Sequence, residues 1–294
     1  MIIKSSQEMR NLTGSYYANN DFSKIEALLE AVEQELCATL GMNTLESLQE
    51  GDALQAAKRA VAYMATMRFY RLNDISHEDE GRKVKIDREN EARPFEWQLA
   101  RDDRTHLEEY YRALDRLISL LQEDKAFHQS HVWKRQQLLI VKSADTLAWL
   151  IGVDNSPWLY VRLIPFLAES QHFVEKAYGD ALNPEQSDIF PSTDTLDYAA
   201  QMAVALGGVA LMGRRTSLQT MPYGLMKLYE SEGGGNRQEA AALDRLDDYL
   251  KHLSREQHYW INEMKIRRDR AAGLPVAGHL QIPENDPHNK FMRV

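Results

Sequence analysis

The chain contains 294 residues, of which 44% are hydrophobic, 27% charged and 9% aromatic. This balance is that of an ordinary globular protein, so collagen-like, coiled-coil and intrinsically disordered classes are not expected. Acidic side chains outnumber basic ones by 44 to 35, which gives a net charge of -9. Because an acidic surface repels phosphate at long range, sequence-specific nucleic-acid binding is not expected either.

Three further features bear on cellular location. Cys37 is the only cysteine, so no intramolecular disulfide can form. The first residues lack the long apolar stretch of a signal peptide. The most apolar segment, 199–212, is too short to span a bilayer about 30 Å thick, and it contains Gln201. Together these features predict a cytoplasmic protein without a membrane segment.

Residues 1–41 predict two helices. Ser5 and Glu8 have the spacing of a capping box, in which each side chain satisfies a backbone N–H group that the helix leaves free. Ser23 and Glu26 repeat this spacing before a second helix, and a glycine at position 41 is typical of a helix end. Apolar residues in the second helix recur every three or four positions, which predicts one buried face. They are Ile25, Leu28, Leu29, Val32, Leu36 and Leu40.

Longer helices are expected near 52–72 and 105–122, the first with Asp52 as its N-cap. The insert between them, 73–103, is long for a compact fold, and such loops are usually functional or disordered. Its stretch 81–87 alternates in polarity, as a short strand or an extended arm would. Four residues of the insert are candidate interface residues: Arg82, Lys83, Lys85 and Trp97.

The second half of the chain repeats the first. Residues 2–14 match 140–152, 138 positions later, with five identities in thirteen positions. Later matches follow in the same order at shifted offsets, as loop insertions require. They pair 60–62 with 203–205, 113–117 with 242–246, and 131–133 with 258–260. We interpret the pattern as a tandem duplication, in which unit one comprises 1–138, unit two comprises 139–272, and 273–294 form an extended C-terminal arm.

Unit two is expected to contain helices near 194–212 and 238–253, separated by a second insert, 214–236. Asp194 is the expected N-cap of the first of these helices. Gly207 and its neighbour Gly208 lie inside that helix, where each glycine costs about 1 kcal/mol. We therefore expect another helix to approach closely there, with a functional hinge as the alternative.

A basic cluster lies close to the end of unit two, at Lys265, Arg267, Arg268 and Arg270. A solvated helix face explains such a run more simply than a nucleic-acid site does. Arg267 and Arg268 remain candidate interface residues.

Motifs for catalysis or cofactor binding are missing from the sequence. It contains no phosphate-binding loop, no dinucleotide-binding glycine pattern and no nucleophile elbow. Glu169 and His172 form the Glu-x-x-His pair that di-iron helical bundles use. The equivalent positions of unit one are Ala31 and Gln34, so the duplication supplies no second pair of ligands.

A second histidine pair, His128 and His131, is spaced so that both side chains could bind one zinc ion. No cysteine cluster accompanies the pair, which favours a structural role. We therefore expect no cofactor, no metal ion and no catalytic residues.

Three stretches carry a family likeness: 2–8, 94–98 and 110–117. They resemble a family of uncharacterised proteins from gut bacteria and their phages, whose members look like prophage structural proteins. The resemblance covers most of the chain and implies a place at the neck, where small helical proteins form a ring between the capsid portal and the tail. Unit two departs from the pattern, since its insert lacks the Trp97–Gln98 pair and Thr146 stands in place of Glu8.

The expected fold is all-α, with two tandem, pseudo-symmetric helical bundles. The resemblance implies a non-catalytic structural or adaptor protein that forms homo-oligomers and contacts other phage structural proteins, without sequence-specific nucleic-acid or membrane binding. Its location would be the host cytoplasm or the virion. Two alternatives remain open: a helical enzyme with a metal site at Glu169 and His172, and a host-encoded helical scaffold.

Overall fold

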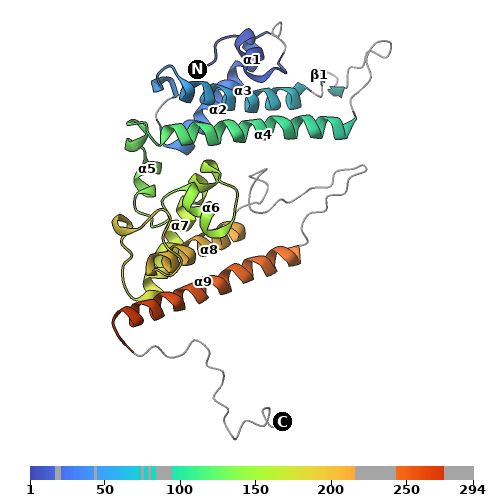
Figure 1. Cartoon of the computed structure of the whole chain (residues 1–294). Coiled ribbons are helices and arrows are strands. Elements are labelled where there is room, and N and C mark those ends of the chain that lie inside the picture. Colours follow the sequence, from blue (N-terminus) through green and yellow to red (C-terminus); the bar gives the residue numbers. More distant parts are fainter. Residues whose placement is uncertain are drawn as a thin grey trace.

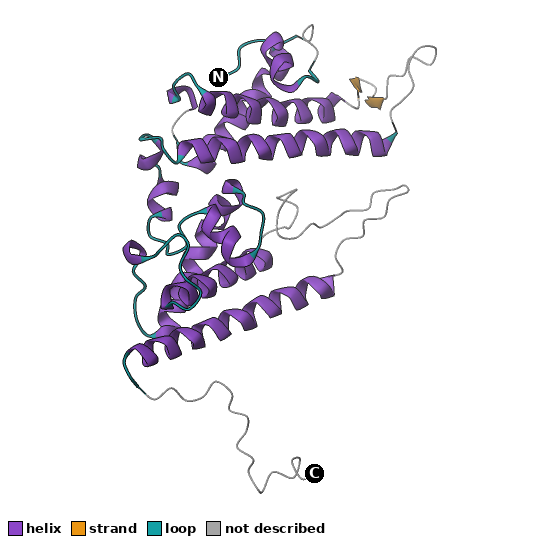
Figure 2. Ribbon diagram, in the orientation of Figure 1, coloured by secondary structure: helices purple, strands orange, loops and turns teal. Residues whose placement is uncertain are grey.

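A computed structural model describes residues 1–16, 21–42, 45–73, 76–78, 81–83, 95–215 and 243–274, without the side chains of 76–78, 81–83, 96 and 243–246. Within these ranges the protein is all-α apart from one short hairpin, as expected (Figure 2). The helices are α1 (Ser6–Thr13), α2 (Ser23–Leu40), α3 (Asp52–Asn73), α4 (Glu96–Leu121), α5 (His131–Gln136), α6 (Ala144–Ile151), α7 (Pro157–Tyr178), α8 (Leu196–Arg215) and α9 (Leu243–Ala271). Short 3-10 turns lie at η1 (Leu45–Ser47), η2 (Phe127–Gln129) and η3 (Pro184–Gln186).

The helices form two groups that follow each other along the chain (Figure 1). In the first group, α4 returns alongside α3, and α1 and α2 also pack against α3. In the second group, α9 returns alongside α8, and α6 and α7 pack against α8. The short helix α5 connects the groups. Both groups thus have the same order along the chain: a short helix (α1 or α6), a longer helix (α2 or α7), and then a pair of long helices that pack side by side (α3 with α4, or α8 with α9).

The hairpin lies between α3 and α4. Strand β1 (Ser76–Glu78) pairs with β2 (Gly81–Lys83) in antiparallel fashion, with Ser76 opposite Lys83. The alternating stretch 81–87 was expected to form a strand or an arm, and its first three residues are β2.

The first helix of each group has the same caps. The Ser5 hydroxyl accepts a hydrogen bond from the Glu8 N–H at 3.1 Å, and the Ser143 hydroxyl accepts one from the Thr146 N–H at 3.1 Å. Both helices end at a glycine, in positions 14 and 152, with φ of 71° and 63°. This left-handed conformation is open to glycine without a steric penalty, which is why these residues stop the helices.

A tertiary hydrogen bond recurs at the same offset. The N–H of Ile2 donates to the Glu33 carboxylate at 2.8 Å, and the N–H of Ile140 donates to the Gln171 side-chain oxygen at 3.0 Å. Each bond joins the segment before the first helix to the middle of the second helix, and each acceptor is largely buried. Positions 138 residues apart therefore occupy equivalent places near the start of each group.

Two of the later sequence matches do not join equivalent places. Residues 113–117 lie in the last third of α4, whereas 243–246 are the first residues of α9. Residues 131–133 lie in α5, whereas 258–260 lie in the middle of α9. The likeness of the two groups therefore rests on the matches at offset 138, on the match of 60–62 in α3 with 203–205 in α8, and on the common helix order.

Several predicted helix ends were wrong. Helix α4 begins at Glu96, so residues 96–103 belong to a helix and not to the predicted insert, while α9 continues to Ala271. The side chain of Gln98 accepts a hydrogen bond from the Phe95 N–H at 2.9 Å, which stabilises the early start of α4. The N-cap of α8 is Thr195, whose hydroxyl accepts from the Tyr198 N–H at 3.1 Å, and not Asp194.

The glycines of α8 lie where three helices cross. A Cβ atom on Gly207 would lie 2.0 Å from Gln257 Nε2 of α9 and 2.3 Å from Ser170 Oγ of α7, and one on Gly208 would lie 2.7 Å from a methyl group of Leu167. An added Cβ atom at either glycine would force these side chains to move, so the predicted close approach of other helices is confirmed.

Helix α8 is also long and apolar enough to cross a membrane, judged by length and composition alone. In its most apolar 18-residue window, however, 67% of the residues are buried inside the protein. Its one polar core residue, Gln201, donates to the Ser187 hydroxyl and to the Asp188 carbonyl, both at 2.7 Å. The helix is packed as the core of the second group.

Candidate interaction surface

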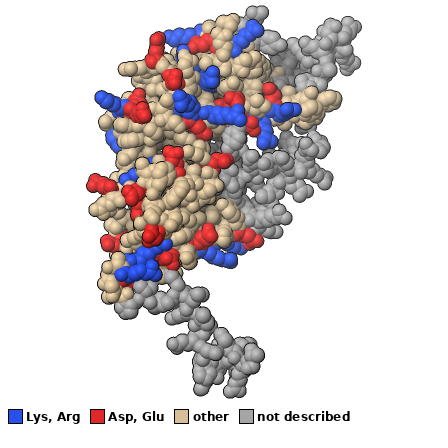
Figure 3. All heavy atoms as spheres, in the orientation of Figure 1, with Lys and Arg blue, Asp and Glu red and all other residues tan. Residues whose placement is uncertain are grey.

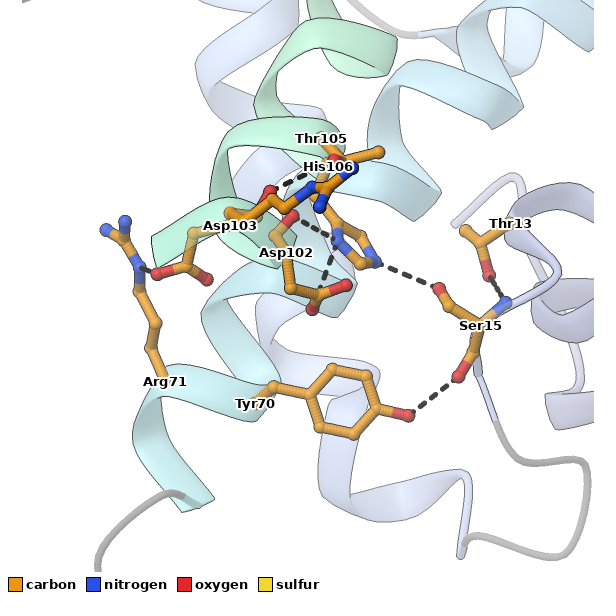
Figure 4. A network of polar contacts seen from close by, with 9 residues as sticks. Thr13, Ser15, Tyr70, Arg71, Asp102, Asp103, Thr105 and His106 are labelled. Atoms are coloured by element: carbon orange, nitrogen blue, oxygen red, sulfur yellow. Dashed lines mark hydrogen bonds and ion pairs between the residues drawn. The ribbon is translucent and has the colours of Figure 1, made fainter. Parts of the chain in front are cut away.

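A polar network joins the end of α1 to α3 and α4 (Figure 4). The hydroxyl of Ser15 lies 2.9 Å from His106 Nε2, and His106 Nδ1 lies 3.0 Å from the Asp102 carbonyl and 3.5 Å from its carboxylate. The order serine, histidine, aspartate is that of a hydrolase triad. No sequence motif indicated any of these three residues.

The surroundings of His106 indicate a structural role for this network. His106 is only 4% exposed. One ring nitrogen contacts the Ser15 hydroxyl just after α1, and the other contacts the backbone carbonyl of Asp102, one turn earlier in α4. The hydroxyl of Tyr70 in α3 donates to the Ser15 carbonyl at 3.0 Å, and Arg71 binds the Asp103 carboxylate at 2.7 Å. These bonds hold three helix ends together.

The Glu169–His172 pair, which the sequence suggested as a metal site, does not form one, because Glu169 binds an arginine. Both carboxylate oxygens of Glu169 accept hydrogen bonds from the Arg215 guanidinium, at 2.5 and 2.8 Å. These bonds lower the pKa of the Glu169 carboxyl, and His172 is exposed. Arg215 is the last residue of α8, so the prediction that it belongs to the second insert, 214–236, was wrong. Among the described residues, no group of three histidine, cysteine or acidic side chains is placed to hold a metal ion.

The second histidine pair is also used in packing. His128 stacks on Trp133 with ring centres 4.0 Å apart, and its Nε2 lies 2.8 Å from the Gln122 carbonyl. His131 packs against Gly41, where an added Cβ would lie 2.4 Å from the imidazole Nδ1. The two rings thus serve different contacts and share no ligand position.

The basic interface candidates have different environments. Arg82 and Lys83 lie in β2, and Lys85 lies outside the described residues. Arg267 is mostly buried, packs over Trp260 at 5.7 Å, and donates to backbone carbonyls at 193 and 195. Arg268 is more exposed and lies over the Tyr178 ring at 5.2 Å. Arg267 therefore serves the fold directly, by holding the segment before α8.

The aromatic candidate Trp97 is exposed at the start of α4. Its side chain is 54% exposed and that of Phe95 is 67% exposed. The two rings are nearly parallel, with an interplanar angle of 9° and centres 6.5 Å apart. This Phe95–Trp97 pair is an apolar projection from the first helical group.

A larger aromatic surface lies on the second group. Trp149 of α6 makes edge contacts with Phe190 at 6.0 Å and with Tyr198 of α8 at 5.5 Å. Tyr198 contacts Trp260 of α9 at 5.3 Å, and Trp260 contacts Tyr259 at the same distance. We call these five residues the aromatic band. Phe190 is 60% and Trp149 44% exposed.

Acidic side chains flank the aromatic band. Asp145 lies one helical turn before Trp149 on α6, and Asp188 and Asp194 lie on either side of Phe190 in the segment before α8. All three are exposed. On the face of the molecule drawn in Figure 3, by contrast, basic and acidic side chains are interspersed.

Sequence reasoning missed most of the aromatic band. No motif or periodicity in the sequence indicated Trp149 or Phe190. In the repeat, Trp149 occupies the position that corresponds to Asn11 of unit one, 138 residues earlier. A large apolar residue in place of a polar one on an exposed face could have indicated Trp149 as an interface residue. Phe190 lies outside the helices, where periodicity gives no information.

The two helical groups are joined through a partly buried acidic residue of α4. Asp115 accepts hydrogen bonds from the Ser156 hydroxyl at 2.8 Å and from the Trp158 N–H at 2.9 Å, both at the N-terminus of α7. Burial raises the pKa of the Asp115 carboxyl, against the effect of these two bonds. Beside it lies a cavity of about 430 Å³, whose lining includes Asp115, Arg116, Asp145, Asn155 and Tyr160.

Comparison of the chain with protein-family models, with curated proteins and with solved structures finds no match in any of the three.

Proposed function

We propose that this protein is a non-catalytic structural or adaptor subunit of a phage-like particle, located at the head–tail connector or neck, and that it assembles with copies of itself. The family resemblance of 2–8, 94–98 and 110–117 implies this role. The observation that carries self-assembly is the aromatic band with its exposed Trp149 and Phe190.

The composition of the band supports protein binding. Interfaces are enriched in tryptophan, tyrosine, phenylalanine and arginine, and a few such side chains supply most of the binding energy. Large aromatic side chains that are left exposed next to one another mark interaction sites more often than isolated surface residues do. The band contains two tryptophans, two tyrosines and one phenylalanine in a continuous series of ring contacts.

The charge of the protein agrees with a place around a DNA passage. With a net charge of -9, the subunit repels the phosphate backbone weakly at physiological salt, so a ring of copies lets DNA pass without retaining it. This step is an analogy with ring-forming neck proteins in general.

Size-exclusion chromatography with light scattering on the full chain tests self-assembly, and negative-stain electron microscopy then shows whether the assembly is closed. We expect a discrete oligomer at micromolar concentration. A monomer at every concentration and salt, which also fails to bind a portal or tail protein encoded beside its gene, would contradict the proposal.

Substitutions in the aromatic band test whether this surface mediates the assembly. Trp149→Ser with Phe190→Ser should raise the apparent dissociation constant at least tenfold, because both side chains lose their apolar contact area. The matched control is Leu72→Ser, which removes another exposed apolar side chain, at the end of α3. Equal effects of the two variants would argue against a specific interface at the band.

The genes beside this one distinguish a phage protein from a host-encoded scaffold. Portal, protease and capsid genes in the same operon support the particle role. An operon of host metabolic genes would instead favour the scaffold.

A further inference from the structure

We infer that the aromatic band of one copy binds the Phe95–Trp97 pair of a second copy, so that subunits associate head to tail. This inference rests on the self-assembly proposed above and names the two surfaces that meet. It assigns a partner to the exposed aromatic pair at the start of α4.

The first argument is that the two surfaces differ and lie apart. In Figure 1, α4 begins at the right-hand end of the first group, whereas the segment between α7 and α8, which contains Phe190, lies on the left side of the second group. One copy therefore does not cover its own band with its own Phe95–Trp97 pair. A contact between two different surfaces is heterologous, and repetition of such a contact closes a ring when the rotation between subunits permits.

The second argument is charge complementarity. Arg101 follows Trp97 by one helical turn on the same side of α4 and is exposed, whereas the next arginine on this side, Arg104, is paired with Glu108 at 3.1 Å. The band is flanked by the exposed carboxylates of Asp145 and Asp188. Docking Trp97 on the band brings the Arg101 guanidinium toward these carboxylates, which favours this pairing.

The third argument is the shape of the aromatic surfaces. Phe95 and Trp97 lie nearly parallel, whereas neighbouring rings of the band meet at interplanar angles of about 80°. Aromatic rings prefer edge-to-face or offset contacts, and exposed rings on both surfaces can make such contacts. Each aromatic side chain buries about 150–250 Å² when it is fully covered.

A mixing experiment tests the head-to-tail contact directly. Variant one carries Trp97→Ser and keeps the band; variant two carries Trp149→Ser with Phe190→Ser and keeps the Phe95–Trp97 pair. Each variant alone should be monomeric, at concentrations where the wild type is oligomeric. Mixed at equal concentration, they should form a one-to-one heterodimer and nothing larger, because only one intact pair of surfaces remains.

The outcomes separate this inference from the proposed function. If Trp97→Ser still forms the wild-type oligomer while variant two does not, the head-to-tail inference is overturned and self-assembly through the band stands. If both variants are monomeric and remain so when mixed, the inference is also overturned. A monomeric wild type overturns both the head-to-tail inference and the proposed self-assembly.

Charge reversal provides a second, independent readout. Arg101→Glu should weaken assembly at least tenfold, and combining it with Asp188→Lys in the same chain should restore most of the loss. Both side chains are exposed, so the fold does not depend on either of them. Thermal unfolding followed by circular dichroism checks that each variant is folded. Absence of rescue, with Asp145→Lys as the alternative partner tested in the same way, would overturn the charge pairing.

Discussion

Two histidine–carboxylate pairs show the difference between spacing in the sequence and chemistry in the fold. Glu169 and His172 have the spacing of a metal motif, yet the Glu169 carboxylate is bound by Arg215. His106 belongs to no motif, yet it is buried and contacted at both ring nitrogens. Its partner Ser15 is 91 positions away in the chain, so only the fold could bring the two together.

Removal of the buried imidazole tests its structural role. His106→Ala should destabilise the protein by about 1–3 kcal/mol, because the Ser15 hydroxyl loses its partner and a cavity remains. Urea denaturation measures the loss, and exposed His172→Ala is the matched control, with an expected effect within about 0.5 kcal/mol.

The same network gives a chemical test. We expect Ser15 to be unreactive toward a fluorophosphonate, since its hydroxyl serves to hold α1 in place. Stoichiometric labelling of Ser15 that is lost in His106→Ala would show instead that this serine is a nucleophile.

Gly207, where α8 crosses α7 and α9, gives a second prediction about stability. Gly207→Ala should lower the free energy of unfolding by about 1–3 kcal/mol, because its methyl group would overlap Gln257 and Ser170. Thermal or urea unfolding measures this. An unchanged or raised stability, as for alanine in an open helix, would show that α7 and α9 do not approach α8 as described.

At the scale of elements, helix type and position were predictable and helix ends were less so. The apolar stripe of α2 is confirmed, with Ile25, Leu29, Val32, Leu36 and Leu40 buried and Leu28 partly buried. The start of α4 was missed because its first turns carry exposed aromatic and charged residues without a buried face. The cap of α8 was assigned one residue too early, since Asp194 and Thr195 are both good N-cap residues.

The junction between α4 and α7 gives a prediction about hydrogen bonding. Asp115→Ala should destabilise the protein by about 1–3 kcal/mol, because the Trp158 N–H and the Ser156 hydroxyl lose their acceptor. Asp115→Asn keeps an acceptor oxygen without the partly desolvated charge, so it should be at least as stable as the wild type at pH 7. Urea denaturation of the three proteins distinguishes these outcomes.

The Asp115→Asn substitution also predicts how the stability difference from the wild type depends on pH. The folded protein raises the pKa of Asp115, so it binds this proton more tightly than the unfolded chain does. Relative to Asp115→Asn, the wild type should therefore gain stability as the pH falls through the folded pKa, and the gain should level off below the unfolded pKa, which is about 3.9. A difference that is independent of pH would show that Asp115 has the same pKa in both states.

At the scale of the whole molecule, the sequence predicted the all-α class correctly, because amphipathic periodicity extends over most of the chain. The duplication remains an inference, supported by the caps at Ser5 and Ser143 and by the recurring bonds from Ile2 and Ile140. The aromatic band could not be predicted, since it joins side chains from α6, α8, α9 and a loop. Such surfaces depend on tertiary packing and not on spacing along the chain.

Quantitative mass spectrometry of purified particles tests the proposed role most directly. Particles collected from cells that carry the gene are separated on a density gradient, and this protein is quantified against the portal and major capsid proteins. We expect it to co-sediment with the particles at a copy number close to that of the portal and far below that of the capsid protein. Its absence from particles that contain both portal and tail proteins would contradict a place at the neck.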